Sequence, residues 1–237
     1  MTDRRDVSPA TRVGFLLLVL GSAAGLWWIV GSDPTPADEA PGARTWTSSV
    51  ECRDCHAGAW NEWLGSQHQI AYLNPEVRAL SDDFRNKACQ ACHLPRPVAV
   101  TGYERRTLHR TTLPDEGVSC LTCHLGADGG ILARNDRPDA PCAPRADSEF
   151  TSASMCASCH NQHGTTDQWR ATPFASEGTE CTDCHMPAVA ARTGGRSHVY
   201  PGGHDRDTLL RAIDVAAGVE QGALVITVEN RGAGHNF

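Results

Sequence analysis

The most apolar stretch of the chain lies near its N-terminus. Residues 13–30, VGFLLLVLGSAAGLWWIV, carry no charge. This length is near the lower limit for a helix that crosses a membrane. Arg4, Arg5 and Arg12 precede the stretch and Asp33 follows it, so the excess of positive charge before it predicts that the remainder of the chain is exported. A cleaved signal peptide is the alternative, although such peptides usually have a shorter apolar core.

Apolar positions farther along the chain predict short helices. Trp60, Leu64 and His68 recur at every fourth position, which predicts a helix over residues 53–73 with these side chains on one face. The Asn74-Pro75 pair is typical of a helix N-cap followed by the first helical residue.

The helix that starts at Pro75 is expected to carry Val77, Leu80 and Phe84. Clusters of Gly, Pro and Asp at residues 113–117 and 126–130 then predict loops.

Near the C-terminus the period of the pattern changes to two. Residues 208–215 and 223–228 alternate between apolar and polar positions, and a glycine-containing segment separates them. This pattern predicts a β-hairpin. A two-stranded hairpin is rarely stable alone, so we expect it to be the start of a β domain that continues beyond residue 237.

One five-residue pattern, Cys-x-x-Cys-His, occurs five times, and we number its copies motifs 1 to 5. The copies are Cys52, Cys55 and His56; Cys89, Cys92 and His93; Cys120, Cys123 and His124; Cys156, Cys159 and His160; Cys181, Cys184 and His185. The pattern is the attachment signature of c-type haem. Both thiols bond to the porphyrin, and the adjacent His supplies one axial ligand to the iron. The sequence therefore predicts five covalently bound haem c groups.

Three other uses of paired cysteines are less compatible with this pattern. Structural zinc and redox-active dithiols both use Cys-x-x-Cys units, and a disulfide framework is possible in an oxidising compartment. None of them requires a histidine directly after every second cysteine. Haem attachment explains all five histidines.

Composition supports a fold built around such groups. Aromatic residues make up only 6% of the chain, which also contains 22 glycines and 14 prolines. Five macrocycles would supply the apolar surface that side chains lack. The formal net charge of −7 argues against nucleic-acid binding, which needs a basic surface, and suits docking to basic redox proteins.

We predict four segments in a mainly α-helical chain with many loops. They are an N-terminal membrane anchor at 1–31, a Pro- and Ala-rich linker at 32–48, a pentahaem domain at 49–205, and the start of a β domain at 206–237. Haem is attached to such motifs outside the cytoplasmic membrane, so we expect a periplasmic domain anchored by the N-terminal helix.

Six further histidines are candidates for the second axial ligands: His68, His109, His163, His198, His204 and His235. The five predicted irons need five such ligands, so the count suffices for bis-His ligation throughout. His163 follows His160 too closely to reach the other face of the same haem, so a neighbouring iron is the better partner. His198 and His204 flank a tight turn that would present them to different irons. Bis-His ligation gives lower potentials than Met/His ligation.

Several pieces of the chain resemble the multihaem cytochrome c family that includes cytochrome c-554 and the haem domains of hydroxylamine oxidoreductase-like proteins. The pieces are motif 1 with Trp63 and Ser66-Gln-His68, Glu116-Gly-Val-Ser before motif 3, motif 5 with Met-Pro187, Ser197-His-Val-Tyr-Pro-Gly-Gly-His204, and Gly232-Ala-Gly-His-Asn-Phe237. The resemblance spans about residues 50–237. It implies haems stacked in close pairs, distal ligation by His68, His198 and His204, and a β domain that continues past the last histidine.

These observations predict an electron-transfer protein that connects a quinol-side membrane donor with a periplasmic acceptor. The alternative is a catalytic multihaem oxidoreductase, of the hydroxylamine-oxidising or nitrite-reducing type, in which one iron keeps an open position. The Cys-x-x-Cys-Lys motif that similar nitrite reductases use is absent from the sequence, and the number of histidines leaves no iron obviously bare.

Overall fold

A computed structural model describes residues 44–192 and 194–236. Its contacts divide the chain into two units, Met1–Thr45 and Trp46–Phe237, and the second contains all five motifs. Within the described residues, no helix has both the length and the apolar character needed to span a membrane. The predicted anchor at residues 13–30 lies outside the described part of the chain.

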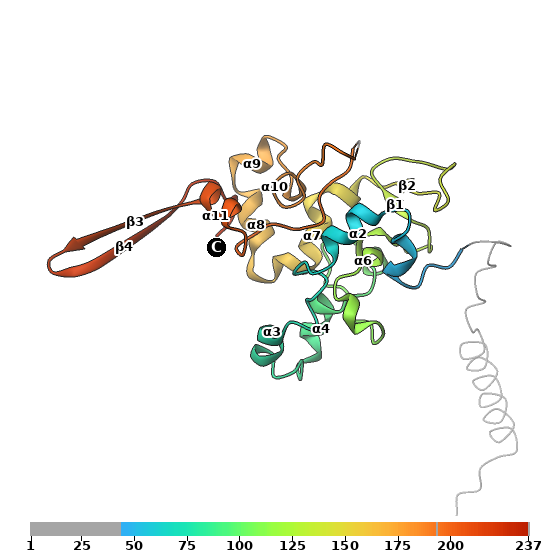
Figure 1. Ribbon diagram of the computed structural model, residues 1–237, viewed down its shortest axis with the longest axis horizontal. Helices are drawn as coiled ribbons and strands as arrows, with labels where there is room; N and C mark the ends of the chain where they lie inside the picture. Colours follow the sequence, from blue (N-terminus) through green and yellow to red (C-terminus); the bar gives the residue numbers. More distant parts are fainter. Residues whose placement is uncertain (1–43, 193, 237) are drawn as a thin grey trace, which may run out of the picture. The chain divides into compact units, whose positions relative to one another are not determined.

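Short helices joined by loops make up most of the second unit (Figure 1). The α-helices are α2 (Ala57–Trp63), α3 (Pro75–Leu80), α4 (Lys87–His93), α5 (Val98–Thr101), α6 (Cys120–His124), α7 (Ala153–His160), α8 (Thr165–Arg170), α9 (Pro173–Ser176), α10 (Cys181–His185) and α11 (Arg206–Ala212). Single 3-10 turns lie at Ser49–Cys52, Pro114–Glu116, Glu149–Thr151 and Asn161–His163.

Two small sheets complete the described elements. β1 (Leu132–Ala133) and β2 (Arg145–Ala146) pair in parallel, and β3 (Ile213–Glu220) and β4 (Ala223–Asn230) pair antiparallel. The mainly helical fold with loops and a C-terminal hairpin agrees with the predicted fold class.

Four of the five motifs lie on helices that end at the motif histidine, namely α4, α6, α7 and α10. Polar caps start these helices. The Asn86 and Ser152 side chains accept hydrogen bonds at the N-termini of α4 and α7, and Ser119 and Glu180 form capping boxes for α6 and α10. Motif 1 differs, because it spans a 3-10 turn and a bend, and His56 is the N-cap residue of α2.

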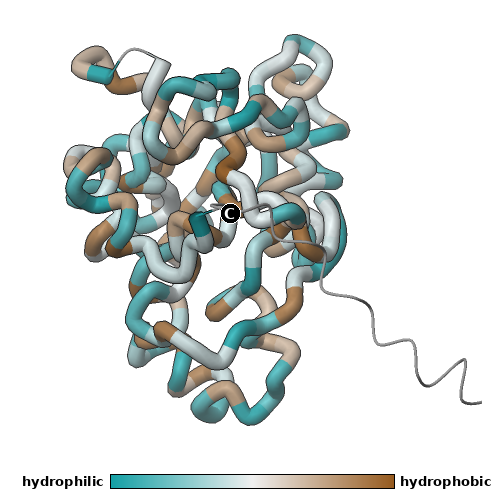
Figure 2. The backbone as a smooth tube through the Cα atoms, turned by 90° about the vertical axis from the view of Figure 1, so that its right-hand side faces the viewer, coloured by the Kyte–Doolittle hydropathy of each residue, from teal (hydrophilic) through white to brown (hydrophobic). Residues whose placement is uncertain are grey.

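The apolar core of the described part is small. Its largest fully buried side chains are Phe84 and Leu132, and three alanines are among the ten buried apolar residues. Hydrophobic segments are scattered among hydrophilic ones along the chain (Figure 2). Polar contacts between the motif regions, described below, add to this small core.

The predicted helix over residues 53–73 is wrong in extent. The helix ends at Trp63, because Leu64 is extended and Gly65 takes a left-handed φ of 83°, and His68 lies in the turns that follow. The left-handed backbone at Gly65 ends the helix, although side chains continue to recur at every fourth position beyond it.

The helix predicted to start at Pro75 does so, with the Asn74 side chain accepting hydrogen bonds from the Glu76 and Val77 N–H groups. It ends at Leu80, which is 90% exposed. Phe84 lies beyond the helix in a left-handed segment, and its side chain is fully buried.

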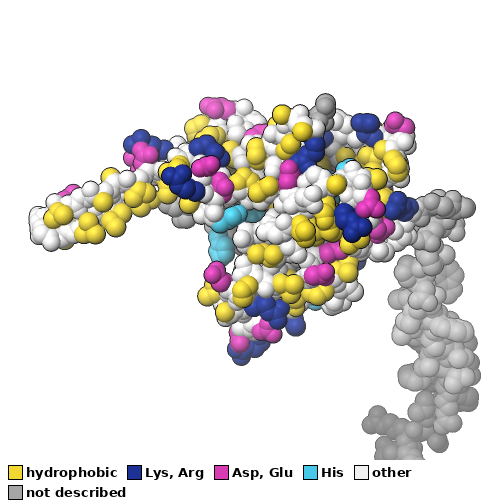
Figure 3. All heavy atoms as spheres, viewed as in Figure 1, with side chains coloured by type: hydrophobic (Ala, Val, Ile, Leu, Met, Phe, Trp, Pro, Cys, Tyr) yellow, Lys and Arg dark blue, Asp and Glu magenta, His cyan; other side chains and the backbone are white. Residues whose placement is uncertain are grey.

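The C-terminal hairpin is present, but its first strand begins later than predicted. Residues 206–212 form α11 because the Asp205 carboxylate caps the Thr208 N–H at 2.8 Å. The register pairs Val215 with Val228 and Val219 with Leu224. These side chains therefore share one face, which is exposed, and apolar groups run along the hairpin in Figure 3.

Candidate haem-binding sites

Motifs 1 and 3 are in contact. The Cys52 and Cys120 side chains lie close to each other. Ser49, just before motif 1, accepts a hydrogen bond from the Cys120 N–H at 3.0 Å and donates one to Glu116 Oε2 at 2.8 Å. Glu116 also accepts from Ser48 Oγ and the Ser49 N–H. A buried carboxylate thus joins the two motifs.

Motifs 2 and 4 make a second contact, between α4 and α7. The Cys92 and Cys159 side chains lie close to each other. Arg106 joins the same two regions, because Nη2 donates to the Ala88 carbonyl at 2.6 Å and Nη1 donates to Gln162 Oε1 at 3.1 Å.

Motifs 4 and 5 make a third contact, between α7 and α10. The Cys156 and Cys181 side chains lie close to each other, and Glu180 Oε2 accepts from the Ala153 N–H at the start of α7 at 2.8 Å. Motif 4 therefore contacts motifs 2 and 5.

Three of the six further histidines face a motif histidine. The ring centroids are 6.1 Å apart for His68 and His160, 6.3 Å for His124 and His198, and 6.0 Å for His185 and His235. An imidazole nitrogen binds a metal at about 2 Å and lies about 1 Å from its ring centre, so two rings on one metal have centroids about 6 Å apart. The three pairs fit one iron each.

Backbone carbonyl groups fix the orientation of four of these rings and of the unpaired motif 2 histidine, His93. Nδ1 lies 2.7–3.0 Å from a carbonyl oxygen in His93, His124, His185, His198 and His235. Because a carbonyl only accepts, Nδ1 is the donor in each contact, which leaves Nε2 as the nitrogen that can bind a metal. Metal-binding histidines use the same arrangement.

Burial favours the neutral, ligating form of the rings. It lowers the pKa of His68 to about 3 and that of His124 to about 4. Burial also lowers the pKa of His198. These side chains are therefore neutral at physiological pH.

The backbone of His68 is held by the segment that precedes motif 3. The Val118 N–H donates to the His68 carbonyl at 2.8 Å. Gly117 has a φ of 42°, and a Cβ there would lie 2.5 Å from the same oxygen. The glycine permits a close approach that no other residue allows.

Tyr200 lies between two of the facing pairs. Its ring centroid is 4.1 Å from that of His68 and 5.9 Å from that of His198, and its φ is 55°. Tyr200 was not among the predicted site residues, although its place between His198 and His204 was the available signal.

The remaining candidate positions are arranged differently. His56 and His93 face no second imidazole among the described residues. The His93 ring instead lies 5.5 Å from the Phe84 ring, which stacks on Tyr72 at 4.7 Å. An aromatic cluster therefore occupies one side of the motif 2 histidine.

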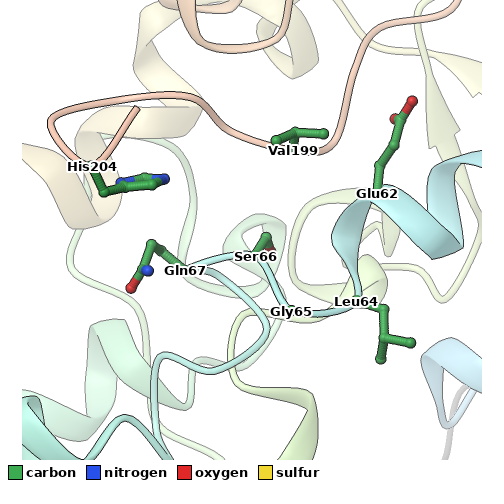
Figure 4. A pocket seen from close by; sticks show the side chains of 7 residues that line it. All are labelled: Glu62, Leu64, Gly65, Ser66, Gln67, Val199 and His204. Atoms are coloured by element: carbon green, nitrogen blue, oxygen red, sulfur yellow. The ribbon is translucent and has the colours of Figure 1, made fainter. Parts of the chain in front are cut away.

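His109, His163 and His204 are exposed, and none of them faces a motif histidine in the described part. His204 lines a pocket formed with the end of α2, the turn after it and Val199 (Figure 4). Histidine side chains are also grouped at one place on the face seen in Figure 3.

The donor set suits haem iron. The described residues contain no group of three or more His, Cys, Asp or Glu side chains that would hold a metal ion by themselves. A porphyrin supplies four nitrogen ligands, so its iron takes at most two from the protein.

Residues 51–125 match the family model for cytochrome c554 and c-prime. The match covers motifs 1 to 3 and less than half of the chain. It confirms the resemblance to multihaem cytochromes c that the motifs predicted, and it supports a haem-containing electron-transfer protein with covalently bound haem c. No curated protein and no solved structure matches the chain.

Proposed function

We propose that this chain is a pentahaem c-type cytochrome that transfers electrons between a membrane donor and an exported acceptor. The observation that carries the proposal is the set of three facing histidine pairs, each with one member from a Cys-x-x-Cys-His motif. A haem iron held by two imidazoles exchanges single electrons at low potential.

The contacts between motifs support transfer along a series of sites. Motif 1 contacts motif 3, and motif 4 contacts motifs 2 and 5. Tyr200 lies between the His124–His198 pair of motif 3 and the His68–His160 pair of motif 4, and so connects these two motifs. All five motifs thereby belong to one connected set, as a carrier requires.

A catalytic role is the second candidate, and the surroundings of His93 favour it. This ring contacts Phe84 rather than another imidazole. A haem at motif 2 with no second protein ligand would accept a small molecule such as hydroxylamine or nitrite. This candidate predicts chemistry at one motif and electron transfer at the others.

Haem counting and spin state test the proposal. Purified full-length protein should contain five haems per chain by pyridine haemochrome assay. Electron paramagnetic resonance should give low-spin signals from the haems of motifs 3, 4 and 5, whose histidines are paired. A high-spin signal with carbon monoxide binding would favour the catalytic candidate, and a chain without haem would contradict both.

Single variants test the facing pairs. His68→Ala, His198→Ala and His235→Ala should each convert one haem to a high-spin, carbon-monoxide-binding form, because each removes one of two imidazoles. His163→Ala is the matched control, because His163 is exposed and faces no motif histidine. Four identical low-spin spectra would reject the assigned pairs.

The proposed location follows from the motifs and from residues 13–30. We propose that these residues anchor the protein and that the haem domain is periplasmic. Cell fractionation should place the protein in the membrane. A variant in which a cleavable signal peptide replaces residues 1–31 should instead be found in the periplasm. A cytoplasmic haem-loaded protein would contradict this location.

A further inference from the structure

Arg192 lies in the loop between motif 5 and His198, and only part of its guanidinium group is paired. Nη2 donates to Glu62 Oε2 at 2.6 Å and to the Arg196 carbonyl at 3.2 Å. An arginine has five N–H donors, so these two bonds leave three N–H groups, on Nε and Nη1.

The unpaired atoms are buried. Neither Nε nor Nη1 of Arg192 has a hydrogen-bond partner among the described residues. Buried donors on a charged group are costly to leave unpaired. Such atoms indicate that a further acceptor belongs at this place.

The position of Arg192 identifies the region that this acceptor must come from. A Cβ added to Gly58 would lie 3.3 Å from Arg192 Nη1, and Gly58 follows His56 by two residues. Glu62 Oε2, which accepts from Arg192, also accepts from the His198 N–H at 2.9 Å. The guanidinium therefore lies between motif 1 and the segment that brings His198 to motif 3.

We propose that Arg192 donates hydrogen bonds from Nε and Nη1 to a haem propionate carboxylate at the boundary of motifs 1 and 3. This inference rests on the proposed haem-binding function. Planar guanidinium groups and carboxylates form strong, charge-assisted hydrogen bonds. Glu62 holds Arg192 in place and fixes the His198 backbone, so one ion pair positions both a distal ligand and a propionate donor.

Resonance Raman spectroscopy of the full-length, haem-loaded protein tests the inference through the propionate bending band. Arg192→Gln should shift this band, and it should lower the midpoint potential of one haem because a positive charge is lost near it. Arg192→Lys keeps the charge but lacks the Nε donor, so the band should still shift while the potential stays close to that of the unsubstituted protein.

Arg206→Gln is the matched control, because the Arg206 side chain is 83% exposed and lies 3.7 Å from its carboxylate partner. It should change neither the band nor any potential. If Arg192→Gln lowered the number of bound haems, Arg192→Lys would carry the test. An unchanged band in both Arg192 variants would overturn the inference, and a water molecule would then be the partner of these donors.

One variant background separates the possible sources of the propionate, and the number of bound haems separates the possible failures. In a Cys52→Ala, Cys55→Ala background, a band shift that persists on Arg192→Gln assigns the propionate to the motif 3 haem, and its disappearance assigns it to the motif 1 haem. Five haems with an unchanged band would reject only the role of Arg192. An unsubstituted chain without haem would reject the proposed function as well.

Discussion

Gly117 offers the sharpest test of how the chain positions a distal ligand. Its φ of 42° favours glycine, and a Cβ would lie 2.5 Å from the His68 carbonyl oxygen and closer still to that of Gln69. Ordinary carbon–oxygen contacts are about 3.3 Å or longer. Gly117→Ala must therefore displace the backbone of His68 by about 1 Å.

The cost of this substitution has two parts. A left-handed backbone costs a residue with a side chain about 1–2 kcal/mol, and overpacking adds about 1–3 kcal/mol. Gly129→Ala isolates the first part, because Gly129 has a φ of 82° and nothing lies within 4 Å of its added Cβ. In a domain of this size each kcal/mol lowers Tm by about 2–4 °C, so Gly117→Ala should melt about 2–12 °C below Gly129→Ala.

Thermal unfolding followed by circular dichroism measures this difference, and electron paramagnetic resonance adds a second measurement. Displacement of His68 should weaken one iron ligand, so Gly117→Ala should gain a high-spin signal that Gly129→Ala lacks. If the two variants melted together and remained low-spin, the close approach of Gly117 to His68 would not be what positions this ligand.

Three further predictions concern the side chains of Glu116, Asp128 and Tyr200. Glu116→Gln replaces a buried carboxylate oxygen that accepts from Ser49 with a donor, so it should lower the free energy of unfolding by about 2–3 kcal/mol in a denaturant titration; an unchanged midpoint would contradict the role of Glu116 in joining motifs 1 and 3. The Gly130 N–H, which donates to the Asp128 carboxylate, lowers the pKa of Asp128 in the folded protein. Asp128 therefore stabilises the fold fully above its pKa in the unfolded chain, which is about 3.9. This stabilisation is lost as the pH falls through the lower pKa of the folded protein. Asp128→Asn should therefore flatten the dependence of Tm on pH below about pH 4, and parallel curves for the two proteins would count against it. Tyr200→Leu should alter the low-spin signals of two haems at once, whereas Tyr200→Phe, which keeps the ring, should leave both signals unchanged.

The elements that the sequence predicted correctly are those with local causes. The start of α3 follows from the Asn74 cap and Pro75, and the hairpin follows from alternation that places Val215 and Val228 on one face. The long helix over residues 53–73 was wrong because Gly65 breaks it. Residues 206–212 were missed as a helix because the cap at Asp205 competes with a strand-like pattern.

The arrangement of the site depends on contacts between distant residues. The motif histidines were evident from spacing alone. Nothing local indicates that His68 faces His160 or that His235 faces His185. Gly117 belongs to a piece singled out for its resemblance, but its purpose becomes clear only when the His68 carbonyl lies against it.

The central place of α7 has a consequence for the order in which the chain assembles. Motifs 1 and 3 contact each other without α7, so they can dock once residue 124 has been synthesised. Motif 2 has its partner contact on α7, which ends at His160, and it must wait although it precedes motif 3 in the sequence. The sequence of motif 2 is therefore complete before its neighbour on α7 exists.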